Sequence, residues 1–357
     1  MGYLWYKTVR LYVQFGLRSY FKKTIVIGKE HIPKDCPILF VGNHRNGLID
    51  PIMVATTSSR VHLFLTRASA FKDPIVNFLL RSINMIPIFR IRDGVNTIQK
   101  NQEIFDACHR EFEMNGSVLM FPEGNHSLPR RIRTLTKGFA RIAFGYLDAY
   151  PNADLQIITT GLNYSNAQDK GSSICVYYGN PIDVREYYNM EDENQGIETL
   201  KDRVCESLKT ITTHIDAQHN HEEVETYLIH KGIDFLDPIK ANKIIAETTQ
   251  WDVVTKKLPH KKSLWAKFIQ LTFTINTLIP IRIWNRLKDK PKDIVLVPTF
   301  RYGLSLGLVP LCYMLQSVLI GLFSSALIGL LYFIGSILVL LLYKNSIYTD
   351  SVTTKPS

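Results

Sequence analysis

The sequence predicts an α/β domain with a layered architecture and a mostly parallel central sheet, followed by a C-terminal transmembrane helical hairpin. Two observations carry this prediction. Short apolar runs alternate with segments of helical periodicity through the middle of the chain, and a long run without charged residues stands near its end. Hydrophobic residues make up 46% of the 357 residues, which excludes an intrinsically disordered chain.

The N-terminal segment, residues 1–23, combines basic and aromatic side chains and has no acidic residue. Interleaved Lys, Arg, Trp and Tyr are typical of an amphipathic helix in the headgroup region of a membrane. We therefore expect an interfacial helix here, and an amphipathic helix packed on the following domain is the alternative. A secretory signal is not expected, because a long apolar core and a small-residue cleavage site are both missing.

Residues 24–217 form the expected α/β domain. Apolar runs with the length and composition of buried strands lie at 37–42, 62–66, 83–89, 117–121, 155–162 and 173–178. Helical periodicity occupies 51–57, 74–82, 95–114, 136–150 and, as a closing helix, 196–217. None of the five cysteines lies in a CxxC pair, so neither a disulfide framework nor a thiolate zinc module is expected.

Two further segments follow this domain. Residues 218–262 are polar and are interpreted as an accessory helical segment, in which His219 and His221 are read as a solvated helix end more readily than as metal ligands. Residues 263–293 contain an apolar stretch from Phe268 to Ile283 with basic residues on both sides. This stretch is too short to span a bilayer and predicts an interfacial or re-entrant helix.

Residues 294–345 carry the predicted hairpin. The 42 residues from Tyr302 to Tyr343 include no charged side chain, which is enough for two helices of about 20 residues each. The expected turn is at Phe323-Ser324-Ser325. Arg301 and Lys344 would then lie on one side of the membrane, which the positive-inside tendency makes cytoplasmic. The alternative is a buried helical hairpin in a soluble core.

The first candidate site follows the first apolar run, in Asn43-His44-Arg45-Asn46-Gly47-Leu48-Ile49-Asp50-Pro51. The carboxyl ends of strands are where α/β domains build their sites. A neutral His44 is suited to remove a proton from a hydroxyl, and Asp50 on its other ring nitrogen would fix the tautomer and stabilise the imidazolium. Asp50 and Pro51 also fit the N-cap and first position of the next helix, and the two roles are compatible.

The second candidate site is a pair of arginines after the third apolar run. Arg90 and Arg92 stand at alternate positions and would share one face of an extended segment. Arginine binds phosphate through two parallel hydrogen bonds, so the pair is suited to a phosphate clamp. A solvated loop is the alternative.

The third candidate site is Pro122-Glu123-Gly124-Asn125-His126, after the fourth apolar run. Glu123 is expected to orient an acceptor hydroxyl or a neighbouring cation. A metal site of His44, Asp50, Glu123 and His126 is the weaker alternative, because these residues form neither an HxxxH nor an HxH pair.

Together these blocks resemble the glycerolipid (phospholipid/glycerol) acyltransferase family. The resemblance rests on Asn-His-(x)5-Asp-Pro, a strand-terminal Phe-Arg, Phe-Pro-Glu-Gly and a fourth block, Thr160-Gly161-Leu162-Asn163-Tyr164. It covers roughly residues 25–215. It implies a glycerol-phosphate acyltransferase-like fold and transfer of a fatty acyl group from acyl-CoA or acyl-carrier protein to a hydroxyl of a glycerol-3-phosphate or lysophosphatidate type acceptor.

The resemblance also implies roles for individual residues. His44 is the base and Asp50 is its partner, Arg90 contacts the phosphate or the acceptor, and Glu123 and Gly124 belong to acceptor binding. The neighbours that complete the candidate substrate-binding set are Asn43, Arg92, Asn125 and His126.

Two positions depart from the family's common pattern. The first block has five residues between His and Asp where four are common, and the longer form resembles the glycerol-3-phosphate acyltransferase branch with a C-terminal membrane hairpin. The third block reads Asn125-His126 where Thr-Arg is common, and Arg130 or Arg131 is the candidate to replace the missing arginine. Glycerol-3-phosphate, a lysophosphatidate and a non-phosphorus lysolipid therefore all stay open as acceptors, as do the acyl chain length and the donor.

The residues and the resemblance agree on a mechanism. His44 removes the acceptor hydroxyl proton, and the alkoxide attacks the thioester directly, so no nucleophilic Ser or Cys is needed and no Gly-x-Ser-x-Gly elbow is found. No metal or organic cofactor is required. Backbone N–H groups near the first block are expected to stabilise the oxyanion. The alternatives are a non-catalytic membrane lipid-binding protein and a lipid hydrolase or thioesterase in which His44 activates water.

The net charge of +10 fits nucleic acid, anionic lipid or phosphorylated substrates. Because the basic clusters flank apolar runs and not aromatic stacking platforms, nucleic acid is not an expected partner. The expected partners are membrane lipids, acyl-CoA or acyl-carrier protein, and a phosphorylated glycerol or lysolipid acceptor. We expect a multi-pass membrane protein with its catalytic domain on the cytoplasmic face and a polar tail at 346–357.

Overall fold

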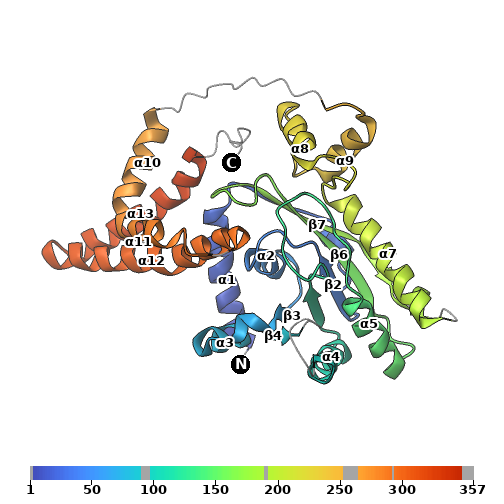
Figure 1. Cartoon of the computed structure of the whole chain (residues 1–357). Coiled ribbons are helices and arrows are strands. Elements are labelled where there is room, and N and C mark those ends of the chain that lie inside the picture. The colour runs from blue at the N-terminus through green and yellow to red at the C-terminus, as the bar shows by residue number, and fades with distance from the viewer. Residues whose placement is uncertain (1–2, 90–96, 189–191, 252–263, 292, 348–357) are drawn as a thin grey trace.

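A computed structural model describes residues 3–89, 97–188, 192–251, 264–291 and 293–347 of the chain (Figure 1). Its centre is a seven-stranded sheet with helices on both faces. After this domain the chain continues into a small helical segment and then into a group of helices from which two long apolar ones project away from the sheet.

The strands are short, and helices connect most of them. In chain order the strands are β1 (Thr24–Ile27), β2 (Ile38–Gly42), β3 (His62–Arg67), β4 (Met85–Ile88), β5 (Ser117–Met120), β6 (Gln156–Tyr164) and β7 (Ile174–Asp183). The helices of the sheet domain are α1 (Tyr3–Tyr20), α2 (Ile49–Thr57), α3 (Pro74–Ser82), α4 (Thr97–Glu113), α5 (Gly138–Ala149), α6 (Arg185–Tyr188) and α7 (Glu193–Ile211). The later helices are α8 (His221–His230), α9 (Pro238–Glu247), α10 (Leu264–Asn276), α11 (Leu278–Leu287), α12 (Val297–Phe323) and α13 (Ala326–Ile347). Short 3-10 turns are η1 (Lys29–His31), η2 (Ala68–Phe71) and η4 (Ile294–Leu296).

The strand order across the sheet is β1-β7-β6-β2-β5-β3-β4. Paired strands run parallel except for β6 and β7. Strand β2 lies between β5 and β6, and Val41 is in register with Met120 on one side and Thr159 on the other. The carboxyl ends of these three strands therefore meet at one edge of the sheet, where parallel sheets place their sites.

Both faces of the sheet are covered, so alternate residues of β2 enter different cores. Leu39 and Val41 pack with side chains of α4, α5 and α7, whereas Ile38 and Phe40 pack with side chains of α1 and α2. All four side chains are fully buried. A strand buried on both faces forms a continuous apolar run in the sequence, which is why β2 could be predicted.

The predicted fold class is confirmed, with two differences in the sheet. Strand β1 was not predicted, because its four residues are mostly exposed and pair only at the sheet edge with β7. Strands β6 and β7 are antiparallel, because the chain between them, residues 165–173, is too short for the crossover that a parallel pair requires.

The closing helix of this domain is shorter than predicted. Helix α7 ends at Ile211, where Asn163 Oδ1 accepts the N–H of Thr213 at 3.2 Å and holds the chain across the end of β6. The predicted accessory segment then begins, and its described part holds α8 and α9. Val224, Leu228 and Ile245 give these two helices a small core of their own.

The single helix predicted from Phe268 to Ile283 is wrong, because this part of the chain forms two helices, α10 and α11. The break falls at Thr277, and Pro280 lies in the first turn of α11. A proline in the middle of a helix lacks the N–H donor and clashes with the preceding turn, whereas the first turn tolerates it.

Helices α12 and α13 form the predicted hairpin, with Ser324 and Ser325 between them. Both are long and apolar enough to cross a membrane, and only 17% and 11% of their apolar windows are buried. This exposure is the opposite of what a helical hairpin in a soluble core shows. The hairpin projects from the sheet domain as a separate arm (Figure 1).

The first turns of α12 pack against the sheet domain. Arg301 donates to the hydroxyl of Tyr20 in α1 at 2.9 Å and to the carbonyl of Gln168 at 2.7 Å. One residue further on, Tyr302 donates to the carbonyl of Val13 at 2.9 Å. The hairpin is thus anchored beside the sheet edge that carries the predicted site.

Candidate active site

His44 and Asp50 form a hydrogen-bonded pair after the carboxyl end of β2. His44 Nδ1 lies 2.8 Å from Asp50 Oδ2, and the Asp50 side chain is completely buried while 17% of the His44 side chain is exposed. An ionised carboxylate accepts hydrogen bonds only, so Nδ1 carries the proton and donates it. The lone pair of His44 then resides on Nε2, which is the state that a general base requires.

Asp50 is held by three further donors. Its Oδ2 accepts the backbone N–H groups of Arg45 and Asn46, each at 2.7 Å, and its Oδ1 accepts the hydroxyl of Tyr164. Four hydrogen bonds offset the cost of burying this carboxylate. The N-cap role expected for Asp50 is wrong, because Leu48 occupies the N-cap of α2 and Asp50 lies inside the first turn, directing its side chain back to the preceding loop.

The His44 ring is bounded by two other rings. Phe121, which follows β5, stacks on it with ring centroids 4.3 Å apart and planes 14° from parallel. His126 stands edge-on to His44, with centroids 5.6 Å apart and planes at 85°. A backbone hydrogen bond from Ser127 to the carbonyl of His44, at 3.0 Å, joins the two loops that carry these rings.

Asn43 ties the first block to β6. Its side-chain amide donates to the carbonyl of Leu162 at 3.3 Å, and its side-chain oxygen accepts the N–H of Leu162 at 2.7 Å. The side chain is 4% exposed. Asn43 therefore supports the loop through both polar atoms of its side-chain amide, and its contact with a substrate stays a prediction.

Glu123 is paired with an arginine, which agrees with the expectation that it orients a neighbouring cation. Its Oε2 accepts from Arg133 Nε at 2.7 Å, and Arg133 also donates to the side chain and carbonyl of Asn125. Burial raises the pKa of Glu123, and the charge of Arg133 opposes that rise. Gly124 has a φ of +74°, which favours glycine at the turn between Glu123 and Asn125.

The two arginines expected to replace the missing family arginine are used elsewhere. Arg130 is 3% exposed and donates to Glu225 of α8 at 2.8 Å and to two backbone carbonyls at the end of β6. Arg131 donates to the carbonyls of Ile215 and Asp216, each at 2.8 Å. Both therefore hold the accessory helices against the sheet domain. His221, considered above as a metal ligand, accepts the N–H of Arg130 at 2.7 Å.

Three of the backbone N–H groups near the first block, where the oxyanion hole was expected, are already bonded. Those of Arg45 and Asn46 point to Asp50, and that of Leu48 donates to Thr299 Oγ1 at 3.0 Å. These three donors are therefore part of the support for the first block. The Arg45 side chain is buried as well, and burial together with the charge of Arg130 lowers its pKa to about 9.

The predicted phosphate clamp, Arg90 and Arg92, lies outside the described residues. The last described residue before it, Phe89, bonds through its backbone N–H and carbonyl to the side-chain amide of Asn101 in α4, at 3.1 and 2.7 Å. The segment that carries both arginines thus starts from a fixed point at the end of β4.

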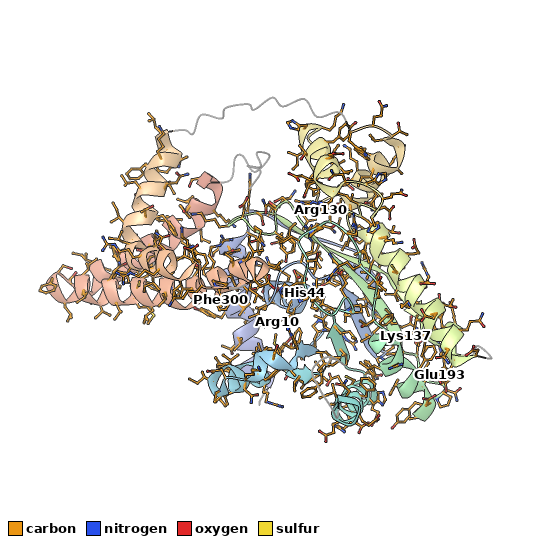
Figure 2. The ribbon with its side chains drawn as sticks, viewed as in Figure 1. Arg10, His44, Arg130, Lys137, Glu193 and Phe300 are labelled. Carbon is orange, nitrogen blue, oxygen red and sulfur yellow. The ribbon has the colours of Figure 1, made fainter. Side chains whose placement is uncertain are left out.

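Sequence reasoning missed four residues of this site: Phe121, Arg133, Tyr164 and Asp293. Tyr164 had a signal, because it ends the fourth block of the family pattern. Asp293 had none, since it lies 167 residues from its partner His126, whose Nε2 it contacts at 2.7 Å. Figure 2 shows His44 between Phe300 of α12 and the sheet, with Arg130 towards the accessory helices.

Comparisons with known proteins agree with the motifs. Residues 23–160 match the family model described as Acyltransferase. Glycerol-3-phosphate O-acyltransferase 1 of Saccharomyces cerevisiae is 30% identical over 112 residues, which is 29% of this chain and 15% of that protein. The 1-acyl-sn-glycerol-3-phosphate acyltransferase of Borreliella burgdorferi is 26% identical over 189 residues, which is 53% of this chain and 73% of that protein.

A third relative, the chloroplastic 1-acyl-sn-glycerol-3-phosphate acyltransferase BAT2 of Brassica napus, is 26% identical over 34% of each chain. The match therefore spans only 15% of the yeast relative and 34% of the Brassica relative. The crystal structure of the 1-acyl-sn-glycerophosphate (LPA) acyltransferase PlsC from Thermotoga maritima has a TM-score of 0.40 and 20% identity, over 57% of this chain and 81% of that one. Residues 23–160 thus match the Acyltransferase family model, and the chain is similar over parts of its length to curated glycerol-3-phosphate and 1-acyl-sn-glycerol-3-phosphate acyltransferases.

Proposed function

We propose that this protein is a membrane-bound acyltransferase that moves a fatty acyl group from acyl-CoA or acyl-carrier protein to a hydroxyl of a glycerol-3-phosphate or lysophosphatidate type acceptor. The observation that carries the proposal is the pair of His44 and buried Asp50, 2.8 Å apart at the end of β2. The names of the curated relatives, which act on glycerol 3-phosphate and its 1-acyl form, support the acceptor class.

The geometry supports direct transfer with His44 as the base. Nε2 of His44 takes the proton of the acceptor hydroxyl, and the oxygen attacks the thioester carbon. When the tetrahedral intermediate collapses, the C–S bond breaks and the new bond between the acyl carbon and the acceptor oxygen remains. The thiolate that leaves takes the proton from the His44 imidazolium. Asp50 keeps the ring in the required tautomer and stabilises its charged form. The steps need no metal or organic cofactor.

The acceptor phosphate requires cations at the same edge of the sheet. Arg133 is the described cation most directly tied to the third block, since it binds Glu123 and Asn125 while 30% of its side chain is exposed. Arg90 and Arg92 are proposed to join it from the segment after β4. Because arginine binds phosphate through a rigid pair of N–H groups, this set suits a phosphorylated acceptor.

The membrane attachment follows from the exposed apolar surface. Beyond α12 and α13, exposed large apolar side chains gather on α1, α3 and α10, and they include Leu4, Leu11, Ile75, Phe78, Leu264 and Trp265. Helix α1 also packs on the sheet domain through buried Tyr6 and Leu17. One face of this helix therefore fits the packed amphipathic helix considered for residues 1–23, and its exposed face fits the interfacial helix. The contribution of α3 was not predicted. We propose a multi-pass protein whose sheet domain lies on the cytoplasmic face.

A product assay distinguishes acyl transfer from its alternatives. Purified protein in vesicles is given labelled acyl-CoA or acyl-carrier protein with glycerol-3-phosphate, lysophosphatidate or a non-phosphorus lysolipid. The proposal predicts acylated acceptor that rises with acceptor concentration. Release of free fatty acid at the same rate with or without acceptor would show a hydrolase or thioesterase, and binding of lipid without any product would show a non-catalytic protein.

A further inference from the structure

We propose that the start of the membrane hairpin is part of the active site, and that Asp293 is a positioning residue that orients His44 through His126. This inference rests on the proposed acyl transfer for its kinetic test. It concerns a contact between His126 of the third block and Asp293, which lies outside residues 23–160, the part matched by the family model.

Asp293 connects the hairpin to His126 with both of its carboxylate oxygens engaged. Oδ1 accepts the N–H of Val295 at 3.0 Å and thereby caps η4, the turn that leads directly into α12. Oδ2 accepts from His126 Nε2 at 2.7 Å. Burial favours a higher pKa of Asp293, but the bonds from Val295 and His126 outweigh it and leave the pKa below its usual range, so the group is ionised near neutral pH.

His126 passes this constraint to His44. The His126 side chain is only 13% exposed, and its ring stands edge-on to the His44 ring. The ring of Phe121 stacks on the same His44 ring. Rotation of His44 about its Cβ–Cγ bond therefore displaces His126, which the bond to Asp293 resists. The direction of the Nε2 lone pair depends on this rotation, and base catalysis depends on that direction.

The same helix holds the first block at a second point. Thr299, one turn into α12, accepts the N–H of Leu48 at 3.0 Å. The contact is close, because a Cβ added to Gly47 would lie 2.6 Å from Thr299 Oγ1 and 2.8 Å from Leu296 Cδ2. The start of α12 thus contacts both loops that surround His44. A change in how the hairpin sits in the bilayer would therefore reach the catalytic ring.

A purely structural role for Asp293 is the competing explanation, and the chemistry of asparagine separates the two. In Asp293→Asn the remaining side-chain oxygen still caps Val295, but an NH2 group faces His126 Nε2 in place of the acceptor. Half of the Asp293 side chain is exposed, so the ion pair itself contributes little to the free energy of unfolding. The variant is therefore expected to fold while the His126 ring loses the charged acceptor of its Nε2–H.

The experiment compares wild type, Asp293→Asn, Asp293→Glu and the control Asp289→Asn in vesicles. Asp289 is exposed and lies in the same connection, so the control removes the same charge nearby. We expect kcat to fall about 10- to 100-fold in Asp293→Asn with KM within about twofold, partial recovery in Asp293→Glu, and no change in the control. A fall in thermal midpoint that accounts for the lost activity, or an unchanged kcat, would overturn the proposal.

A second readout does not depend on the proposed reaction. Diethylpyrocarbonate modifies neutral, accessible histidines, and trypsin places His44 and His126 in separate peptides, 35–45 and 111–130, each with a single histidine. The proposal predicts that Asp293→Asn raises the modification rate of His126 several-fold and alters that of His44 at least about twofold. If wild type makes no product but these rates change, the proposed function fails and the positioning contact stands. If His126 changes and His44 does not, the positioning role is refuted.

Discussion

Removing one hydroxyl from Tyr164 should slow turnover without unfolding the protein. Tyr164 is completely buried at the end of β6, and its hydroxyl donates to Asp50 Oδ1, whereas the other three donors to Asp50 described here reach Oδ2. Burial and the charge of Asp50 raise the pKa of Tyr164 far above its usual value, so the group stays a hydrogen-bond donor. Tyr164→Phe keeps the ring and leaves Oδ1 without this donor.

The magnitude follows from the charge of the acceptor. A hydrogen bond to a charged group contributes about 1.5–3 kcal/mol, and each 1.4 kcal/mol in activation free energy changes the rate tenfold. If Asp50 is positioned for His44 mainly through its bonds, kcat should fall between about 10-fold and 150-fold. KM should change little, because neither Tyr164 nor Asp50 is exposed to substrate.

Tyr178→Phe is the matched control. Tyr178 is also completely buried, in the neighbouring strand β7, and its hydroxyl lies 2.8 Å from Thr57 Oγ1, away from His44. Both variants lose one buried hydroxyl, so their thermal midpoints should fall by similar amounts. The assay is the initial rate of acyl transfer at saturating donor and acceptor. Equal rates for the two variants would refute the claim that Tyr164 acts through Asp50.

Three further predictions test the hairpin contact, the core and the membrane surface. Gly47→Ala places a Cβ 2.6 Å from Thr299 Oγ1, so it should lower kcat and weaken the packing of α12 by about 1–3 kcal/mol. Gly303→Ala is the control, because its added Cβ has open space around it, and it should leave kcat unchanged. Burial, with a smaller effect of Arg10 and Arg60, lowers the pKa of His62 to about 3. Because only the unfolded chain takes up this proton as the pH falls below about 6.5, the free energy of unfolding should fall by about 2 kcal/mol between pH 6.5 and 5. The thermal midpoint of His62→Gln should lack this part of the pH dependence. Phe78 on α3 is 61% exposed, so Phe78→Trp should add fluorescence that lipids brominated on their acyl chains quench. Added emission without quenching would show that α3 does not contact the membrane.

The parts of this molecule that sequence reasoning could predict are local in the chain. His44 and Asp50 are six residues apart, in the loop after a strand buried on both faces and in the first turn of the next helix, so the apolar run and the polar block after it were enough to place them. Strand β1 lacked such a signal, because its residues are mostly exposed and it is held only by pairing with β7. Pro280 was a visible signal for the break between α10 and α11, but the prediction followed the continuous apolar stretch from Phe268 to Ile283 and placed one helix there.

The contacts that join distant segments could not be predicted. The departure at His126 was interpreted as a missing arginine with a nearby replacement, whereas the structure pairs His126 with Asp293 and uses Arg130 to hold α8. The order of the strands decides these contacts, because it brings the ends of β2, β5 and β6 to one edge. Nothing in the periodicity of a single sequence reports which strands become neighbours or where a hairpin 167 residues away will pack.

The central claim is that His44 is the base for direct acyl transfer, and His44→Ala tests it most directly. Wild type and variant are reconstituted at equal amounts in the same vesicles, with equal thermal midpoints as the requirement for comparison. The account predicts that the initial rate of acylated acceptor falls at least about 100-fold, and that labelled donor alone leaves no acyl group on either protein. Transfer by His44→Ala at near the wild-type rate, or a stable acyl-enzyme, would contradict it.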